Sequence, residues 1–330
     1  MPQDFFSGRL ACLAPLAGYS DAPLRLIAAE CGADFAFTGL VSADGLSRSA
    51  AGSMRLLGRL PGEAPLGVQL FGADPGRMGR AAAIAAASGA DFIDLNFGCP
   101  VKKVVRKNGG VSIMRDLDLM ERIVRAVVAT VAVPVTAKIR SGWSDEERNF
   151  LEAGRLLEAC GTAAVTLHPR PRSQGFSGAA HWEDIASLRE ALAIPVIANG
   201  DIRTLGDYET VRKITGCSLV MIGRGALGNP WLFREIKDAA LGRTARETGF
   251  VERLDTLERH LALTVEFFGE DHGVREMRKF YRWYVRSVHG IKKHRALLVT
   301  APRARDVAAI IAVMREELDG NGRETAREAS

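Results

Sequence analysis

The sequence predicts a (β/α)8 TIM barrel followed by a C-terminal all-helical domain, and two observations lead to this architecture. Eight short β-rich runs alternate with amphipathic segments over residues 1–243 of the 330-residue chain, and helical patterns alone fill residues 244–330. Alternating strands and helices imply parallel strands joined by crossover helices. Eight such units favour a closed barrel over an open sheet, and about 250 residues are enough for one.

The predicted elements follow the chain in order. The strands are expected at Leu10–Ala14, Phe35–Thr38, Leu66–Leu70, Phe92–Leu95, Val135–Ile139, Ala164–Leu167, Val196–Ala198 and Leu219–Ile222. Helices are expected between several of them, as at Asp118–Val131, Phe150–Cys160 and Leu205–Ile214. The second domain is expected to hold three or four helices, including Arg246–Phe268, His272–Val288 and Arg303–Leu318, and to end in a frayed polar segment, Asp319–Ser330.

Composition and cysteine spacing exclude several classes of protein. Hydrophobic residues make up 47% of the chain, which excludes general disorder. No apolar run reaches the ~20 residues of a membrane helix, and Met1–Phe6 lacks the features of a signal peptide. The five cysteines are scattered and include no Cys-x-x-Cys pair, so we expect no disulfide framework and no metal site. We expect a cytoplasmic protein that has no membrane partner and acts as a monomer.

Polar or glycine-rich residues follow seven of the eight predicted strands, and barrel enzymes carry their chemistry at this end. In chain order they are Pro15-Leu16-Ala17-Gly18, Gln69, Asn96-Phe97-Gly98-Cys99-Pro100, Lys138 with Arg140, His168 with Arg170, Asn199-Gly200-Asp201 and Gly223-Arg224-Gly225. The last two motifs stand where barrels bind phosphate through backbone N–H groups. Arg224 can add charge-assisted hydrogen bonds, although a pair of ordinary turns is the alternative interpretation.

Lys138 lies inside a predicted barrel strand, where a buried cation is costly unless an anion pairs with it. A reduced flavin provides such an anion, because negative charge develops at its N1–C2=O edge. Gln69 can hydrogen-bond the carbonyl and imide edge of the same ring, and Pro15-Leu16-Ala17 offers a flat surface against it. The alternative is a strand-end lysine that reaches solvent. His168 and Arg170 share one side of an extended chain, so both are candidates to face a flavin, its phosphate or RNA.

Cys99 is the candidate catalytic residue. Gly98 and Pro100 fix a sharp exit from the fourth strand and direct the thiol toward the barrel mouth. A thiol with a pKa of about 8.5 is mostly protonated at neutral pH, so it suits an acid better than a nucleophile. Chemistry that adds hydride to one carbon and a proton to its neighbour needs such a group. The other four cysteines are expected to be small buried residues.

A basic patch distinguishes the C-terminal region. Residues 272–305 carry ten Lys and Arg against one acid, Glu276, so this window is +9 and the rest of the chain is −4. An apolar stripe is expected from Val274, Met277, Tyr281, Tyr284 and Val288. The adjacent cationic face consists of Arg275, Arg278, Lys279, Arg282 and Arg286, continued by Lys292, Lys293 and Arg295. Because the charges are of one sign, this face favours RNA phosphate binding over a merely solvated surface.

Taken together, these motifs resemble the tRNA-dihydrouridine synthases, most closely their DusB branch, over nearly the whole chain. The matching pieces are Ala14-Pro15-Leu16-Ala17-Gly18, Asn96-Phe97-Gly98-Cys99-Pro100 with Lys102-Lys103, Lys138-Ile139-Arg140, Asn199-Gly200-Asp201, and Met221-Ile222-Gly223-Arg224 with Asn229-Pro230-Trp231. Their shared order and spacing carry the resemblance. Two departures are Phe176, where an aromatic residue with a hydroxyl is often seen, and Phe280, where a histidine is expected.

The resemblance implies an FMN enzyme that uses NADPH as a transient reductant and reduces the uracil C5=C6 bond of tRNA uridines. Hydride would pass from flavin N5 to C6, and Cys99 would protonate C5. The implied flavin contacts are Pro15, Leu16, Ala17, Gln69, Lys138, His168, Asn199, Gly200, Asp201, Gly223 and Arg224. The implied substrate or RNA contacts are Asn96 at the uracil, with Lys102, Lys103, Arg170, Arg275, Arg278, Lys279, Arg282 and Arg286.

Two other functions fit part of the sequence. A flavin barrel acting on a free pyrimidine, like a dihydroorotate dehydrogenase, would use the same barrel and flavin site but leave the basic tail without a purpose. A non-catalytic RNA-binding or regulatory protein would not need Cys99, Lys138 and both glycine motifs. A purified protein without bound yellow flavin would favour that last function.

Overall fold

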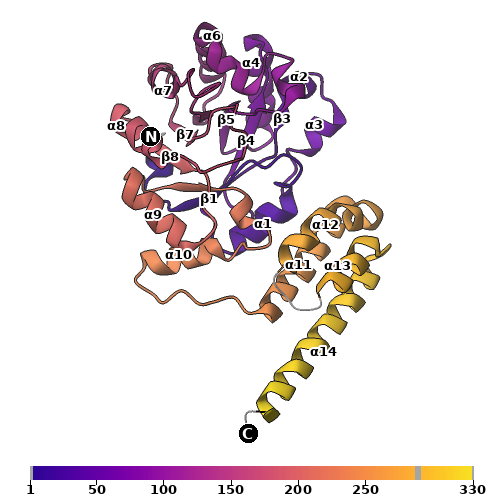
Figure 1. The fold of residues 1–330 in the computed structure, drawn as a ribbon. Coiled ribbons are helices and arrows are strands. Elements are labelled where there is room, and N and C mark those ends of the chain that lie inside the picture. The colour runs from indigo at the N-terminus through magenta and orange to yellow at the C-terminus, as the bar shows by residue number, and fades with distance from the viewer. Residues whose placement is uncertain (1–2, 287–290, 329–330) are drawn as a thin grey trace.

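A closed parallel barrel forms the first part of the molecule, as Figure 1 shows for the computed structural model, which describes residues 3–286 and 291–328. Its strands are β1 (Ala11–Leu13), β2 (Ala36–Phe37), β4 (Leu66–Phe71), β5 (Phe92–Phe97), β6 (Val135–Arg140), β7 (Ala164–His168), β8 (Val196–Asn199) and β9 (Val220–Ile222). Each pairs in parallel with the next, and β1 also pairs with β9, which closes the ring. A short extra strand, β3 (Val41–Ser42), continues beside β4. The predicted (β/α)8 barrel and its eight strands are confirmed.

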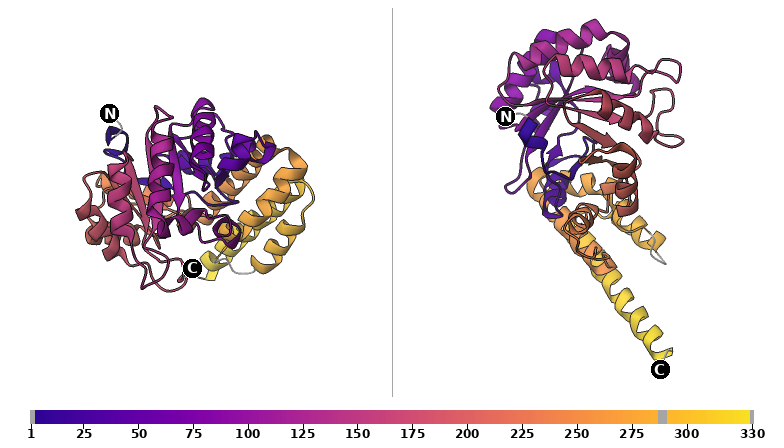
Figure 2. Two further views of the ribbon diagram at one scale, coloured as in Figure 1. Left: turned by 90° about the horizontal axis from the view of Figure 1, so that it is seen from above. Right: turned by 90° about the vertical axis from the view of Figure 1, so that its left-hand side faces the viewer.

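Helices surround this barrel, as the two views of Figure 2 show. They are α1 (Ala22–Glu30), α2 (Ala43–Ser47), α3 (Ala51–Arg55), α4 (Pro75–Ala87), α5 (Lys102–Val105), α6 (Leu117–Val128), α7 (Phe150–Ala159), α8 (Trp182–Ala191), α9 (Leu205–Thr215) and α10 (Leu232–Ala240). Local sequence sets their ends: Asp21 caps α1 by accepting from the Leu24 amide, and Pro23 lies in the first turn. At α9, Thr204 and Asp207 form a reciprocal capping box.

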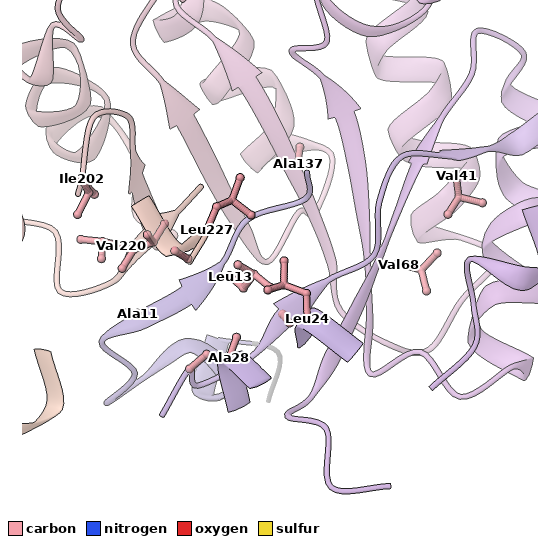
Figure 3. Packing of buried hydrophobic residues seen from close by; sticks show 14 of the residues in the cluster. Ala11, Leu13, Leu24, Ala28, Val41, Val68, Ala137, Ile202, Val220 and Leu227 are labelled. Carbon is pink, nitrogen blue, oxygen red and sulfur yellow. The ribbon is translucent and has the colours of Figure 1, made fainter. Parts of the chain in front are cut away.

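The two faces of each strand serve two different cores, because successive side chains point to opposite sides. In β1, Ala11 and Leu13 belong to the cluster between the strands and the outer helices, whereas Cys12 faces the barrel interior. Figure 3 shows Leu13 beside Leu24 and Ala28 of α1 in the outer cluster. The same alternation determines which side chains of every other strand point inward.

Aromatic rings fill the interior core of the barrel. Phe35, Phe37 and Phe92 contact one another there at centroid distances of 5.2–5.7 Å. The N-terminal 3₁₀ helix (Gln3–Phe6) adds Phe5 and Phe6 to this cluster. Polar inward-facing side chains lie further along the strands, toward their carboxyl ends.

Among the described residues, four helices follow the barrel: α11 (Phe250–Phe268), α12 (Glu270–Tyr284), α13 (Ile291–Thr300) and α14 (Ala304–Glu328). The expected boundary at residues 243 and 244 lies in the connection between α10 and α11. The predicted apolar stripe of α12 is buried at Val274, Met277, Tyr281 and Tyr284, while Val288 lies outside the described residues.

One expectation about this region is wrong. In the part of the C-terminal segment that the structure describes, residues 319–328 are not frayed but form the end of α14. Its last turns contain Arg, Glu and Ala, which favour helix. Within the described residues, no helix is both long and apolar enough to span a bilayer.

The helical region packs against the N-terminal part of the barrel. Arg259 of α11 forms an ion pair with Glu30 of α1. In α12, Lys279 lies 3.7 Å from Asp21, and Arg282 donates to the Tyr19 hydroxyl at 3.4 Å. Asp21 and Tyr19 lie in the loop between β1 and α1, at the carboxyl end of β1. These contacts therefore hold α12 beside the carboxyl end of the barrel.

Candidate active site

A cavity of about 450 Å³ opens at the carboxyl ends of the strands, within the size range of small-molecule sites. It collects most of the predicted site residues, namely Pro15, Leu16, Ala17, Gln69, Asn96, Cys99, Lys138, His168, Asn199, Gly200, Asp201, Gly223, Arg224 and Arg282. All of them except Arg282 of α12 meet because parallel strands bring their carboxyl ends, and the loops that follow, to one rim.

Arg170 does not reach this cavity, which corrects its expected role as a substrate contact. Its side chain is only 1% exposed and donates to Asp201 Oδ2 at 2.5 Å. It also donates to the carbonyl oxygens of Ser177 and Gly178 at 3.1 and 2.7 Å. Arg170 therefore supports the loop that follows β7 and orients the carboxylate of Asp201, which does line the cavity.

A cationic and amide cluster forms one wall of the cavity. Lys138 Nζ donates to Asn199 Oδ1 at 2.7 Å, and His168 Nδ1 lies 3.2 Å from the same oxygen. Asn199 Nδ2 donates to the Met221 carbonyl at 2.8 Å, which fixes the orientation of its amide. Strands β6, β7, β8 and β9 each contribute to this cluster.

Burial changes the charge of this wall. Loss of hydration, with repulsion from Arg140, lowers the pKa of Lys138 to about 7. Burial and the neighbouring Lys138 lower the pKa of His168 well below its ordinary value, so its imidazole is neutral at pH 7. The buried Nε2 of His168 has no hydrogen-bond partner within residues 3–286. The ammonium group of Lys138 donates to a neutral amide, and the Nε2 atom of His168 beside it is unused. Both features fit an anionic, polar ligand in the cavity.

The turn after β9 supplies a narrow cradle. Gly223 and Arg224 begin a short 3₁₀ turn, whose first N–H groups lack partners within the turn. A Cβ atom at Gly225 would stand 2.2 Å from the carbonyl oxygen of Ile202, so only glycine fits there. The guanidinium of Arg224 lies 4.9 Å from the ring centre of Phe176 at the rim. This arrangement of backbone donors and a cation suits a phosphate group.

Hydrogen bonds from neighbouring side chains hold the loop that carries Cys99. The backbone N–H groups of Gly98 and Cys99 donate to Asn96 Oδ1 at 3.2 and 2.8 Å. Arg140 Nε donates to the Gly98 carbonyl at 3.0 Å. Burial raises the pKa of the Cys99 thiol above its ordinary value, so the group stays protonated at neutral pH. Cys12, Cys160 and Cys217 are buried as expected, and Cys31 is half-buried.

Two buried polar side chains near the cavity were missed from the sequence as site residues, and Arg140, which was expected at the strand end, was given no ligand or substrate contact. Asp94 and Thr136 are fully buried beneath Gln69, and Arg140 lines the cavity and donates to the Pro171 and Gly175 carbonyls at 3.0 Å. Alternation was the available signal, because Asp94 stands two residues before Asn96 and Thr136 two before Lys138.

The cationic face of α12 divides into two parts. Arg275, Arg278, Arg282 and Arg286 are exposed. Lys279 turns toward the barrel instead, where it pairs with Glu276 and approaches Asp21, so its expected contact with RNA is corrected. Arg282 and its neighbour Trp283 line the cavity, so the helical region completes one side of it.

Two further exposed lysines lie close to Cys99 in the sequence. Lys102 and Lys103, in the short helix α5 that follows the Cys99 loop, are both exposed. The side chain of Lys292 lies outside the described residues, whereas Lys293 forms an ion pair with Glu317. Exposed cations therefore lie both on α5 and on α12.

Comparisons with known proteins agree on one family. The family model described as Dihydrouridine synthase (Dus) matches residues 12–314. The tRNA-dihydrouridine synthase B of Yersinia pestis is 41% identical over 276 residues, which span 82% of this chain and 85% of that protein. The protein of the same name from Pasteurella multocida is 38% identical over 278 residues, 84% and 83% of the two chains. That from Pseudomonas putida is 38% identical over 322 residues, 94% of each chain.

A solved structure supports the fold alone. Histamine dehydrogenase from Rhizobium sp. 4-9 superposes with a TM-score of 0.52 at 15% sequence identity, over 77% of this chain and 49% of that one.

Proposed function

The chain belongs to the dihydrouridine synthase family, and on this premise we propose that it reduces uridine in tRNA to 5,6-dihydrouridine, with FMN as bound cofactor and NADPH as transient reductant. One observation carries the proposal from the structure. A protonated thiol and a buried lysine share a single cavity, and a helix with exposed arginines lines the same cavity. A tRNA substrate also supports the expected cytoplasmic location.

The cavity fits a flavin through its existing donors. Lys138 would face the N1–C2=O edge of the ring, where an anion would raise the lowered pKa of its ammonium group. Gln69, with Asn96 beside it, would meet the polar edge of the ring. The free Nε2 of His168 would gain a partner from the ring or its side chain. The turn at Gly223 and Arg224 would hold the terminal phosphate.

FMN, when bound and reduced, would supply the hydride for C6 of the uracil. Cys99 would give its thiol proton to C5 and complete the addition across the double bond. The raised pKa of Cys99 suits this role, because the thiol must be protonated when the hydride arrives. Asn96 would contact the uracil, since it borders the cavity directly beside the thiol.

The exposed cations explain how a base inside folded RNA would reach the cavity. Flipping a nucleotide out of its stack costs a few kcal/mol, which phosphate contacts elsewhere can offset. Arg275 and Arg278 on α12, Arg286 just beyond its end, and Lys102 and Lys103 on α5 would make those contacts. A flavin barrel acting on a free pyrimidine would have no use for them, so this surface favours an RNA substrate.

Two measurements test the proposal. The purified protein should be yellow, and its flavin should be bleached by NADPH. Dihydrouridine should disappear from at least one tRNA position in cells that lack the gene, and the purified enzyme should restore it. Unchanged dihydrouridine at every position would refute the proposed activity, and a colourless protein would favour a non-catalytic RNA-binding role.

A further inference from the structure

Beneath the cavity, polar side chains from three adjacent strands form one hydrogen-bonded chain. Thr136 Oγ1 and Gln69 Nε2 donate to different oxygens of Asp94, each at 2.6 Å. Gln69 Oε1 accepts from Asn96 Nδ2 at 2.8 Å. Asn96 Oδ1 accepts from the backbone N–H of Cys99, also at 2.8 Å. The chain therefore runs from the centre of the barrel to the loop that presents the thiol.

The sheet fixes the position of this chain. Gln69, Asp94 and Thr136 are direct partners in register across β4, β5 and β6. All three side chains are essentially unexposed, so water is not available to replace a lost partner. A buried polar network whose members are all satisfied is rigid, and it is costly to break at any one point.

Asp94 sets the direction of these hydrogen bonds from one end, and the backbone N–H of Cys99, which can only donate, matches it at the other. An ionised carboxylate only accepts hydrogen bonds, so Gln69 must face it with its amide nitrogen. The amide oxygen of Gln69 then faces Asn96, which must answer with its own nitrogen. The oxygen of Asn96 is left for the Cys99 amide. An isolated Gln or Asn has no such preference, because the two ends of its amide are nearly identical in shape.

We propose that Asp94 is a positioning residue: it orients the amides of Gln69 and Asn96 and, through Asn96, holds the backbone that presents Cys99. This inference rests on the proposed function and adds a determinant of its geometry. The oxygen of Asn96 is occupied by the amides of Gly98 and Cys99, so Asn96 offers only its second N–H to the cavity. This donor matches a carbonyl oxygen of the bound base.

Two substitutions separate orientation from charge. Asp94→Asn keeps an acceptor toward Gln69 and can donate to the Thr136 hydroxyl, so single-turnover tRNA reduction should stay within about tenfold of wild type. Asp94→Leu removes the acceptor that fixes the Gln69 amide and leaves Asn96 held only from the side of Gly98 and Cys99, and the same rate should fall about 100-fold, because small misplacements of reacting groups cost that much. Thr166→Val is the matched control. It changes a buried polar side chain of β7 that does not belong to the hydrogen-bonded series from Thr136 to Cys99, and it should retain the wild-type rate. A wild-type rate in Asp94→Leu would overturn the proposal, and so would an Asp94→Asn rate as low as that of Asp94→Leu.

Exchanging the carboxylate and the amide between positions 94 and 96 tests the proposal without any activity measurement. This test remains informative if Asp94→Leu does not fold. In Asn96→Asp at pH 8, a carboxylate oxygen would face the oxygen of Gln69, and the Tm of the flavin-loaded protein should fall. In the double variant Asp94→Asn with Asn96→Asp, Gln69 can turn over, so its bonds to residues 94 and 96 can both re-form in the opposite direction, while Thr136 and the Cys99 amide still donate. Its Tm should exceed that of Asn96→Asp by about 3 °C or more, since contacting residues couple. Additive changes in Tm would overturn the proposal.

These experiments distinguish the inference from the function on which it rests. If the wild-type protein formed no dihydrouridine, the proposed function would fail, while the Tm comparison would still decide whether Asp94 orients the two amides. If the wild-type protein is active and Asp94→Leu is equally active, only the positioning role is lost.

Discussion

Replacing Lys138 by Met should stabilise the flavin-free protein at pH 7, and it should lower the reduction potential of the flavin in the flavin-bound protein. Without flavin, the pKa of Lys138 is about 7 instead of 10.5, chiefly because burial removes hydration from the ammonium group. Between pH 7 and 10.5 the unfolded chain therefore binds more protons than the folded one, and the free energy of unfolding rises with pH. The whole shift corresponds to at most about 5 kcal/mol.

Lys138→Met abolishes this titration. At pH 7 the flavin-free variant should be more stable than wild type by up to about 5 kcal/mol, and the difference should shrink as the pH rises toward 10.5. Urea unfolding of both flavin-free proteins from pH 6.5 to 10 measures this directly. Lys213→Met, which changes an exposed lysine of α9, is the control and should reproduce the wild-type pH dependence. A variant less stable than wild type at pH 7 would show that the lysine is not a desolvated cation.

With flavin bound, the same substitution should be harmful. The anionic reduced ring would lose a charged hydrogen-bond partner, which is worth about 1.5–3 kcal/mol. For a two-electron couple this lowers the reduction potential by about 30–60 mV. A redox titration of the flavin absorbance measures the shift. An unchanged potential would refute the placement of Lys138 against the ring, whatever the stability experiment shows.

Three further predictions concern the acid, the RNA surface and the phosphate turn. Cys99→Ala should keep its flavin and its reduction by NADPH but lose about 10²–10⁴-fold in single-turnover tRNA reduction, and a loss of tenfold or less would remove the thiol from the acid role. Replacing Arg275, Arg278 and Arg286 by Ala should reduce the slope of log K against log salt for tRNA binding by about two to three, with NADPH oxidation by a small artificial acceptor unchanged. An unaltered slope would locate the RNA surface elsewhere. Gly225→Ala should reduce flavin retention, because its Cβ would meet a carbonyl oxygen, and full flavin occupancy would contradict the cradle.

Sequence alone was enough to predict the barrel and most of its cavity. Strand and helix periods are local properties, and eight alternating units leave few ways to bury both faces of the strands. Once the barrel is predicted, any residue at a strand's carboxyl end is a candidate for the same rim. For this reason Cys99, Lys138 and Asn199 were brought together correctly from positions far apart in the chain.

Tertiary structure decided which of the candidate side chains meet the cavity and which support it. Arg140 is the last residue of β6 and Arg170 lies two residues beyond β7, yet only Arg140 lines the cavity, because Asp201 and two loop carbonyls hold Arg170 away from it. Lys279 belongs to the cationic stripe by spacing, but the packing of α12 on the barrel turns it toward Asp21.

The hydrogen-bonded chain from Asp94 to Cys99 was equally beyond the sequence. Alternation gives the face on which a strand residue lies, but its partner on the neighbouring strand depends on the register between the two strands, which local sequence does not fix. The contribution of Arg282 and Trp283 to the cavity depends in the same way on how the helical region docks. Local periodicity determines the architecture and the rim, whereas contacts between separate elements determine the orientation of each functional group.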